Sequence, residues 1–217
     1  MNDDQQKAIF ITFEGLDFSG KSTQVKLLTE NLTRRGIKNV VLRDPGGTVI
    51  GERIRSVLLD RASLHMSDFT ELFLFSASRS QLVHELIKPA LVSGTIVVLD
   101  RFYDSTTAYQ GWGRGLPLDS IAAINRLASH GLVPTITYFM DIPVEEVERR
   151  MVRLKANADR MEMSGRSFYG RVREGYLNLA SAEPRFQVID GTLGVEEIQR
   201  AVWARFEKET ALEKAGG

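Results

Sequence analysis

Residues 15–23 read Gly15-Leu16-Asp17-Phe18-Ser19-Gly20-Lys21-Ser22-Thr23 and contain the pattern G-x-x-x-x-G-K-[ST]. An apolar, β-branched run over residues 8–13 precedes them directly, and apolar residues at helical spacing follow at Val25, Leu28 and Leu32. A strand, a glycine-rich loop and a helix in this order let backbone N–H groups converge on an anion at the helix N-terminus. The stretch therefore predicts a phosphate-binding loop and a nucleotide site.

We expect all of residues 15–23 to contact the nucleotide's phosphates. The Lys21 ammonium would add a positive point charge at the β and γ phosphates, and the Ser22 hydroxyl would ligate Mg²⁺. The alternative interpretation, an ordinary glycine-rich turn between a strand and a helix, explains neither the lysine nor the hydroxyl that follows it.

Four more short apolar runs predict further strands, over residues 40–42, 96–99, 136–140 and 186–189. The stretches between them are long enough for helices. Strands that alternate with helices and are apolar throughout are typical of a parallel sheet covered on both faces. Because no repeat or linker composition interrupts the chain, we expect one domain over residues 1–217. The predicted fold class is α/β, with three layers and about five parallel strands.

The composition limits the partners and the location that we expect. The 28 Lys and Arg residues balance 28 Asp and Glu residues, which disfavours nucleic acid as a partner. The chain has no cysteine, which excludes disulfides and thiol catalysis and is typical of a reducing cytosol. The polar start does not resemble a signal peptide, and no apolar run approaches the roughly 20 residues that span a bilayer. We therefore expect a cytoplasmic protein with no membrane partner.

One segment departs from this balance, because residues 149–173 hold eight basic and two acidic residues, a local net charge of +6. On charge alone, a solvated helix whose arginine stems cover apolar surface is the favoured interpretation. The alternative is a basic lid, at about residues 150–168, that closes over phosphates.

A nucleotide site leaves three classes of protein open: a small-substrate kinase, a switch GTPase, and an ATPase motor or chaperone. Residues 44–47 formally fit D-x-x-G, but the guanine-reading pattern N-K-x-D is absent, which disfavours the GTPase. A motor would carry an acidic pair after an apolar strand, whereas the third run ends in the single Asp100 followed by Arg101. A carboxylate at this place can hold Mg²⁺ beside the phosphate loop, and the adjacent Arg101 indicates a second anion.

The sequence resembles the thymidylate kinase family, whose members make dTDP from dTMP and ATP. Residues 100–111, Asp-Arg-Phe-Tyr-Asp-Ser-Thr-Thr-Ala-Tyr-Gln-Gly, carry the resemblance together with Arg114-Gly115. Residues 13–15, 43–48, 74–79 and 88–91 and the basic stretch near Arg160 also occur in family order. The resemblance implies ATP as phosphoryl donor, Mg²⁺ as cofactor, dTMP as acceptor and a homodimer.

The resemblance also implies roles at the acceptor site. Phe75 would stack on thymine, and Arg79, one turn later on the same helix face, would hydrogen-bond the carbonyl edge of the base. Gln110 would be a second base-reading side chain, Tyr109 would crowd a ribose 2′-hydroxyl, and Asp17 would accept the deoxyribose 3′-hydroxyl. The implied substrate-binding set is Asp17, Arg55, Phe75, Arg79, Arg101, Thr106, Tyr109 and Gln110.

Arg55 and Arg101 would hold the acceptor phosphate, which an arginine fork suits better than a lysine does. Without the resemblance, Arg55 reads as a surface charge and Phe75 as a core residue. Asp44 stands where the family usually has Glu, so the contacts made from this position are left open.

A second departure concerns the catalytic cation. Phe18 stands in the phosphate loop where one subgroup of the family places a catalytic Arg. We therefore expect the cation to come from the basic stretch, as in the other subgroup, with Arg153, Lys155 and Arg160 as candidates and Arg160 the first choice.

The implied reaction is in-line phosphoryl transfer. The acceptor monophosphate, with a second pKa near 6, is already mostly a dianion at neutral pH and needs no general base. The expected catalytic residues are Lys21, Arg101, Arg160 and Arg153, with Ser22 and Asp100 as Mg²⁺ ligands. Another pyrimidine nucleotide kinase, a deoxynucleoside kinase, and a nucleotide-binding module of weak activity remain as alternatives.

Overall fold

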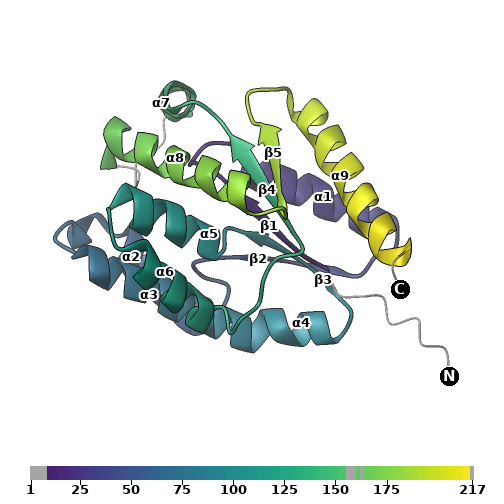
Figure 1. The fold of residues 1–217 in the computed structure, drawn as a ribbon, viewed down its shortest axis with the longest axis horizontal. Helices are drawn as coiled ribbons and strands as arrows, with labels where there is room; N and C mark the ends of the chain where they lie inside the picture. The colour runs from purple at the N-terminus through teal and green to yellow at the C-terminus, as the bar shows by residue number, and fades with distance from the viewer. Residues whose placement is uncertain (1–8, 155–159, 162–163, 216–217) are drawn as a thin grey trace.

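Five parallel strands form a sheet in the computed structural model, which describes residues 9–154, 160–161 and 164–215. Their order across the sheet is β2-β3-β1-β4-β5 (Figure 1). The strands are β1 (Phe10–Glu14), β2 (Asn39–Arg43), β3 (Ile96–Asp100), β4 (Ile136–Asp141) and β5 (Phe186–Asp190). All five predicted strands are confirmed, and no predicted end differs from the observed end by more than two residues.

Helices cover both faces of the sheet, which confirms the predicted three-layer α/β fold (Figure 1). Two helices, α1 (Lys21–Arg34) and α9 (Val195–Ala215), lie on one face. The other face is covered by α8 (Arg166–Ala182), α6 (Leu118–Ala128) and the helical segments between β2 and α6. Successive strand side chains point to opposite faces, so Ile11 packs under α1 and α9 whereas Phe10 packs on the other side.

A long helical segment runs along the second face. It consists of α3 (Asp68–Leu82), the π-helical turn η2 (Val83–Ile87) and α4 (Lys88–Val92). Ahead of it lie α2 (Val49–Leu59) and the 3₁₀ turn η1 (Arg61–Ser63). Side chains cap the N-termini of α2 and α3. Thr48 Oγ1 accepts a hydrogen bond from the Gly51 N–H at the start of α2, and Ser67 Oγ accepts one from the Thr70 N–H at the start of α3.

A second helix with a π-helical end follows β3. It begins as α5 (Tyr103–Thr106) and continues as η3 (Thr107–Gly113). After β4 comes α7 (Val144–Arg153), whose last turns carry the first residues of the basic segment. In the described residues, no helix is long and apolar enough to span a membrane.

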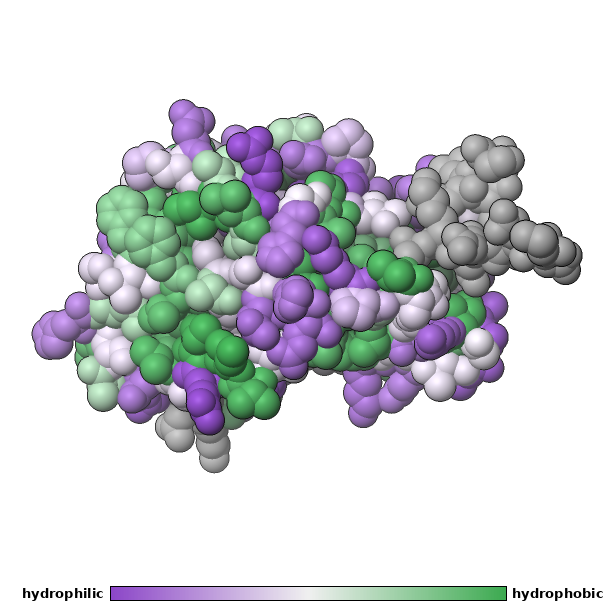
Figure 2. Space-filling model, turned by 90° about the horizontal axis from the view of Figure 1, so that it is seen from below, coloured by the Kyte–Doolittle hydropathy of each residue, from purple (hydrophilic) through white to green (hydrophobic). Residues whose placement is uncertain are grey.

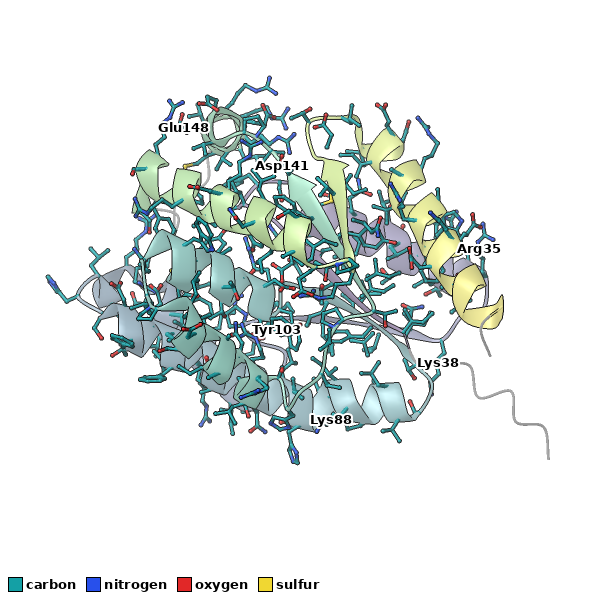
Figure 3. All side chains as sticks on the ribbon, viewed as in Figure 1. Arg35, Lys38, Lys88, Tyr103, Asp141 and Glu148 are labelled. Carbon is teal, nitrogen blue, oxygen red and sulfur yellow. The ribbon has the colours of Figure 1, made fainter. Side chains whose placement is uncertain are left out.

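The strand register brings three loops to one edge of the sheet. Asp100 of β3 lies opposite Phe13 of β1 and Arg43 of β2, so the loops that follow these strands start side by side. Figure 3 shows that Asp141, at the end of β4, lies at the same edge as Glu148 on α7. The carboxyl edge of the sheet is therefore the expected place of the site.

Candidate active site

The phosphate loop connects β1 to α1 and turns sharply at its glycines. Gly15 has a φ of 138° and Gly20 a φ of 95°, values that side-chain-bearing residues rarely adopt. A Cβ on Gly15 would lie 2.5 Å from the Met140 carbonyl oxygen, so this position requires glycine. Because α1 begins at Lys21, Ser22 and Thr23 lie in its first turn, where N–H groups lack intrahelical partners. The loop thus has the form of the predicted anion cradle.

Lys21 lies under the loop with its ammonium buried. Its Nζ donates hydrogen bonds to the carbonyl oxygens of Leu16 at 2.7 Å and Gly15 at 3.2 Å. Burial, followed by repulsion from the Arg101 guanidinium, lowers the pKa of Lys21 to about 8. The ammonium is mostly charged at neutral pH, and a bound phosphate would favour the charged form further.

Ser22 and Asp100, the two predicted metal ligands, lie together. Ser22 Oγ donates a hydrogen bond to Asp100 Oδ2 at 2.7 Å, at the point where β3 ends beside the phosphate loop. Mg²⁺ prefers oxygen ligands and takes only one or two from the protein at such sites, with waters and phosphates supplying the rest. A hydroxyl and a carboxylate at this place fit that requirement.

A cavity opens beside the phosphate loop, and all eight residues of the predicted substrate-binding set line it. Its walls combine aromatic rings, three guanidinium groups and two carboxylates. The lining residues are Asp17, Asp44, Pro45, Arg55, Leu59, Phe75, Arg79, Arg101, Ser105, Thr106, Tyr109, Gln110 and Met161. Phe75, which reads as core from its neighbours alone, is only partly buried and faces this cavity.

Arg101 joins the cavity to the phosphate loop. Its Nη1 donates to the Gly15 carbonyl oxygen at 2.9 Å, and its Nη2 donates to Asp17 Oδ1 at 2.6 Å. Burial alone would raise the pKa of Asp17, but Arg101 and Lys21 hold it below its ordinary value. Arg101 has a φ of 67°, a strained conformation of the kind found at functional sites.

The far wall of the cavity is held by a buried ion pair. Arg79 Nε donates to Asp44 Oδ2 at 2.6 Å, and both side chains are almost completely buried. Arg79 Nη2 also donates to Thr106 Oγ1 at 2.8 Å. Asp44, the shorter acid at this family position, therefore anchors the guanidinium that the resemblance assigns to the base.

Gln110 is tied to a carboxylate on α3. Its Nε2 donates to Glu71 Oε1 at 2.8 Å. Glu71 also pairs with Arg160 at 2.6 Å and with Arg114 at 3.1 Å. One buried acid thus connects the cavity wall to the basic segment.

Comparisons with known proteins show the family of this chain. A family model described as Thymidylate kinase matches residues 13–202. The chain belongs to the thymidylate kinase family. It is 48% identical over 203 residues to the Thymidylate kinase of Chlorobaculum parvum, covering 89% of this chain and 93% of that protein. It is 46% identical over 217 residues to that of Prosthecochloris aestuarii, covering 96% of this chain and 95% of that protein.

A solved structure resembles the whole fold. The crystal structure of thymidylate kinase from Ehrlichia chaffeensis aligns with a TM-score of 0.75 at 34% identity, covering 92% of this chain and 98% of that one. Membership of the thymidylate kinase family makes the chain a nucleoside monophosphate kinase.

The two described candidates for the catalytic cation of this thymidylate kinase family member lie in different surroundings. Arg160 is buried, and its Nε donates to the Leu58 carbonyl oxygen at 2.6 Å while its Nη1 pairs with Glu71. Arg153 ends α7 and is exposed. Lys155 lies outside the described residues. The catalytic roles of Arg160 and Arg153 stay predictions.

Sequence reasoning missed Arg150, which is the basic residue of α7 that contacts the phosphate loop. Its Nη1 donates to the Phe18 carbonyl oxygen at 3.0 Å, and its Nη2 donates to the Gly191 carbonyl oxygen at 2.8 Å. Its place in the +6 segment made it one of several equivalent arginines in the sequence. The contacts with Phe18 and Gly191 distinguish it from the other arginines of the segment that the structure describes.

Glu14, at the end of β1, was also missed. Its Oε1 accepts a hydrogen bond from the Phe102 N–H at 2.7 Å, and its Oε2 accepts one from Ser105 Oγ at 2.6 Å. Burial, with the nearby Asp104 charge second, raises the pKa of Glu14 to about 7. A lone carboxylate at the end of an apolar strand is the signal that could have drawn attention to it. Glu14 holds the backbone directly after Arg101.

Proposed function

We propose that this protein transfers the γ-phosphoryl group of ATP to dTMP, with Mg²⁺, and releases dTDP and ADP. The observation that carries the proposal is the position of Arg101, which bonds to the phosphate loop through Gly15 and lines the cavity with Asp17. The donor's terminal phosphate and an acceptor phosphate would therefore meet at one guanidinium. That arrangement suits a transfer between two phosphates.

The acceptor nucleotide would lie in the cavity with its base on Phe75 and its phosphate toward Arg55 and Arg101. Since the phosphate is mostly a dianion at neutral pH, one of its oxygens attacks the γ-phosphorus directly and no proton has to be removed. The bond to the β-phosphate oxygen breaks, and that oxygen leaves with its electron pair as part of ADP. The chain's task is to align and neutralise the two anions.

The donor side supplies the rest of the neutralising charge. Lys21 would turn its ammonium from the loop carbonyls to the β and γ phosphates, and the loop N–H groups would hold the phosphate oxygens. A bound Mg²⁺ would supply further neutralisation of the negative charge on the phosphates. Ser22 and Asp100 would be the residues that hold it.

The test is ATP turnover with dTMP, dUMP, dCMP, UMP, AMP and thymidine offered singly, followed as ADP release and by separation of the nucleotide products. We expect turnover to be fastest with dTMP. Rapid phosphorylation of thymidine without turnover of dTMP would contradict the proposal. Turnover that is fastest with another pyrimidine nucleotide would reassign the acceptor.

We also propose that the protein forms a homodimer through an exposed apolar face of α2 and α3. Figure 2, which views the molecule from below, shows hydrophobic side chains gathered on the side where these helices lie. Exposed apolar residues of the two helices are Val49, Ile50, Val57, Phe69 and Phe73. Contiguous apolar surface of this kind marks interaction sites.

Light scattering after size exclusion tests the dimer. Phe73→Glu should shift the protein from dimer to monomer, because it places a charge in the proposed interface. Val92→Glu, at the exposed end of α4, is the matched control and should leave the mass unchanged. A monomeric native protein would refute this part of the proposal. The cytoplasmic location stays a prediction.

A further inference from the structure

Gln110 lines the cavity with one end of its amide already bound. Its Nε2 lies 2.8 Å from Glu71 Oε1. An ionised carboxylate only accepts hydrogen bonds, so the amide nitrogen, and not the amide oxygen, must face Glu71. The Gln110 Oε1 acceptor is then the end available to a ligand in the cavity.

Glu71 is held in its ionised form by the groups around it. Burial alone would raise the pKa of Glu71, but hydrogen bonds and charge from Arg114, Gln110 and Arg160 hold it below its ordinary value. The side chain is almost completely buried and binds two guanidinium groups as well as the amide. It does not line the cavity, and of its partners Gln110, Arg114 and Arg160, Gln110 is the one in the cavity wall.

Pyrimidine bases differ in what they offer to an acceptor. Thymine and uracil carry a hydrogen on N3, whereas N3 of cytosine has a lone pair and no hydrogen. An acceptor in the cavity wall therefore favours the first two bases, and a donor would favour cytosine. The Phe75 ring in the same cavity provides a face on which a planar base can stack.

We propose that Glu71 is a positioning residue that sets the polarity of the Gln110 amide, so that the cavity presents an acceptor to pyrimidine N3 and selects dTMP over dCMP. This inference rests on the proposed function.

The test compares kcat/KM for dTMP, dUMP and dCMP in charge-matched variants. Glu71→Gln alone would remove the acid that Arg114 and Arg160 share, so we combine it with Arg114→Met, and the double variant keeps the net charge of the chain unchanged. The amide introduced at position 71 could offer Gln110 either a donor or an acceptor, so the Gln110 amide could turn. We expect the dTMP/dCMP ratio to fall by about tenfold or more. The dTMP/dUMP ratio should hold, because both bases carry the N3 hydrogen.

Arg114→Met alone is the matched control, since it leaves the hydrogen bond between Glu71 and Gln110 in place. It should keep both ratios. Glu71→Asp is a second variant that conserves all charges and withdraws the carboxylate from Gln110 by one methylene. It should shift the dTMP/dCMP ratio in the same direction, and its thermal unfolding can be checked independently.

Two results would overturn the proposal. One is a dTMP/dCMP ratio that does not differ between Arg114→Met and the two other variants, the double variant and a folded Glu71→Asp. The other is a fall in kcat/KM by the same factor for dTMP, dUMP and dCMP in the Glu71 variants, which would indicate a merely structural role for Glu71. Absence of dTMP turnover in the native protein would instead refute the proposed function.

Discussion

Arg150 Nη1 donates a hydrogen bond to the carbonyl oxygen of Phe18 at 3.0 Å. The basic segment therefore contacts the phosphate loop at Phe18, the position where one subgroup of the family has a catalytic arginine. The same guanidinium reaches the Gly191 carbonyl oxygen, in the loop after β5. Arg150 also pairs with Glu146 one turn earlier on α7, which fixes its direction. Of the described arginines in the segment, it is the one with a contact to Phe18.

Arg150→Ala should lower kcat/KM for ATP by about 100-fold, because a positive charge beside the donor phosphates is lost where it acts on the transition state. Steady-state kinetics with varied ATP measure the effect. The matched control is Arg149→Ala, which removes a neighbouring arginine that binds the same Glu146 but is 73% exposed. Equal losses in the two variants would show that α7 contributes only general charge.

Arg160→Ala should destabilise the fold by about 3 kcal/mol and raise KM for dTMP, because removing one partner leaves Glu71 with less compensation of a buried charge. Chemical denaturation and dTMP titration measure the two effects. The sequence-based prediction differs. If Arg160 is a cation that acts in the transition state, Arg160→Ala should lower kcat alone and leave KM and stability nearly unchanged. That pattern would support Arg160 as the catalytic arginine.

Asp44→Ala should destabilise the protein by about 3–5 kcal/mol, because it leaves the Arg79 guanidinium buried without its acid. The midpoint of thermal unfolding is the measurement. Asp119→Ala, at an exposed position on α6, should change it little and serves as the control. A normal midpoint in Asp44→Ala would mean that Arg79 finds another acceptor in the cavity.

The raised pKa of Glu14 predicts that this group makes the protein less stable as the pH rises. Its pKa is raised in the folded state to about 7, above the ordinary 4.5 of the unfolded chain, so between these values the folded state holds the extra proton. Stability from this group is therefore present below pH 4.5 and is lost as pH rises through 7. Relative to Glu14→Gln, the native protein should lose about 1–3 kcal/mol between pH 5 and pH 8.

Urea denaturation of both proteins at the two pH values tests this. The comparison removes the titration of Glu14 together with its interaction with the nearby Asp104 carboxylate, and the other titrating groups are shared by the two proteins. A free-energy difference that does not change with pH would show that Glu14 is ionised throughout.

Local patterns predicted the sheet, the phosphate loop and the Ser22–Asp100 pair. Each depends on residues within one strand–loop–helix unit, or on the rule that parallel strands end at one edge. The eight cavity residues were inferred from the family resemblance, since nothing in the local pattern distinguishes Phe75 from core or Arg55 from surface.

The internal contacts of the site were beyond any local pattern, because they join residues far apart in the chain. Arg79 and Asp44 are 35 positions apart, Gln110 and Glu71 are 39 apart, and Arg150 and Phe18 are 132 apart. A sequence shows that guanidinium and amide groups are present, but not which acceptors their donors meet. That depends on which side chains the folded helices bring within about 3 Å of one another, where a hydrogen bond forms.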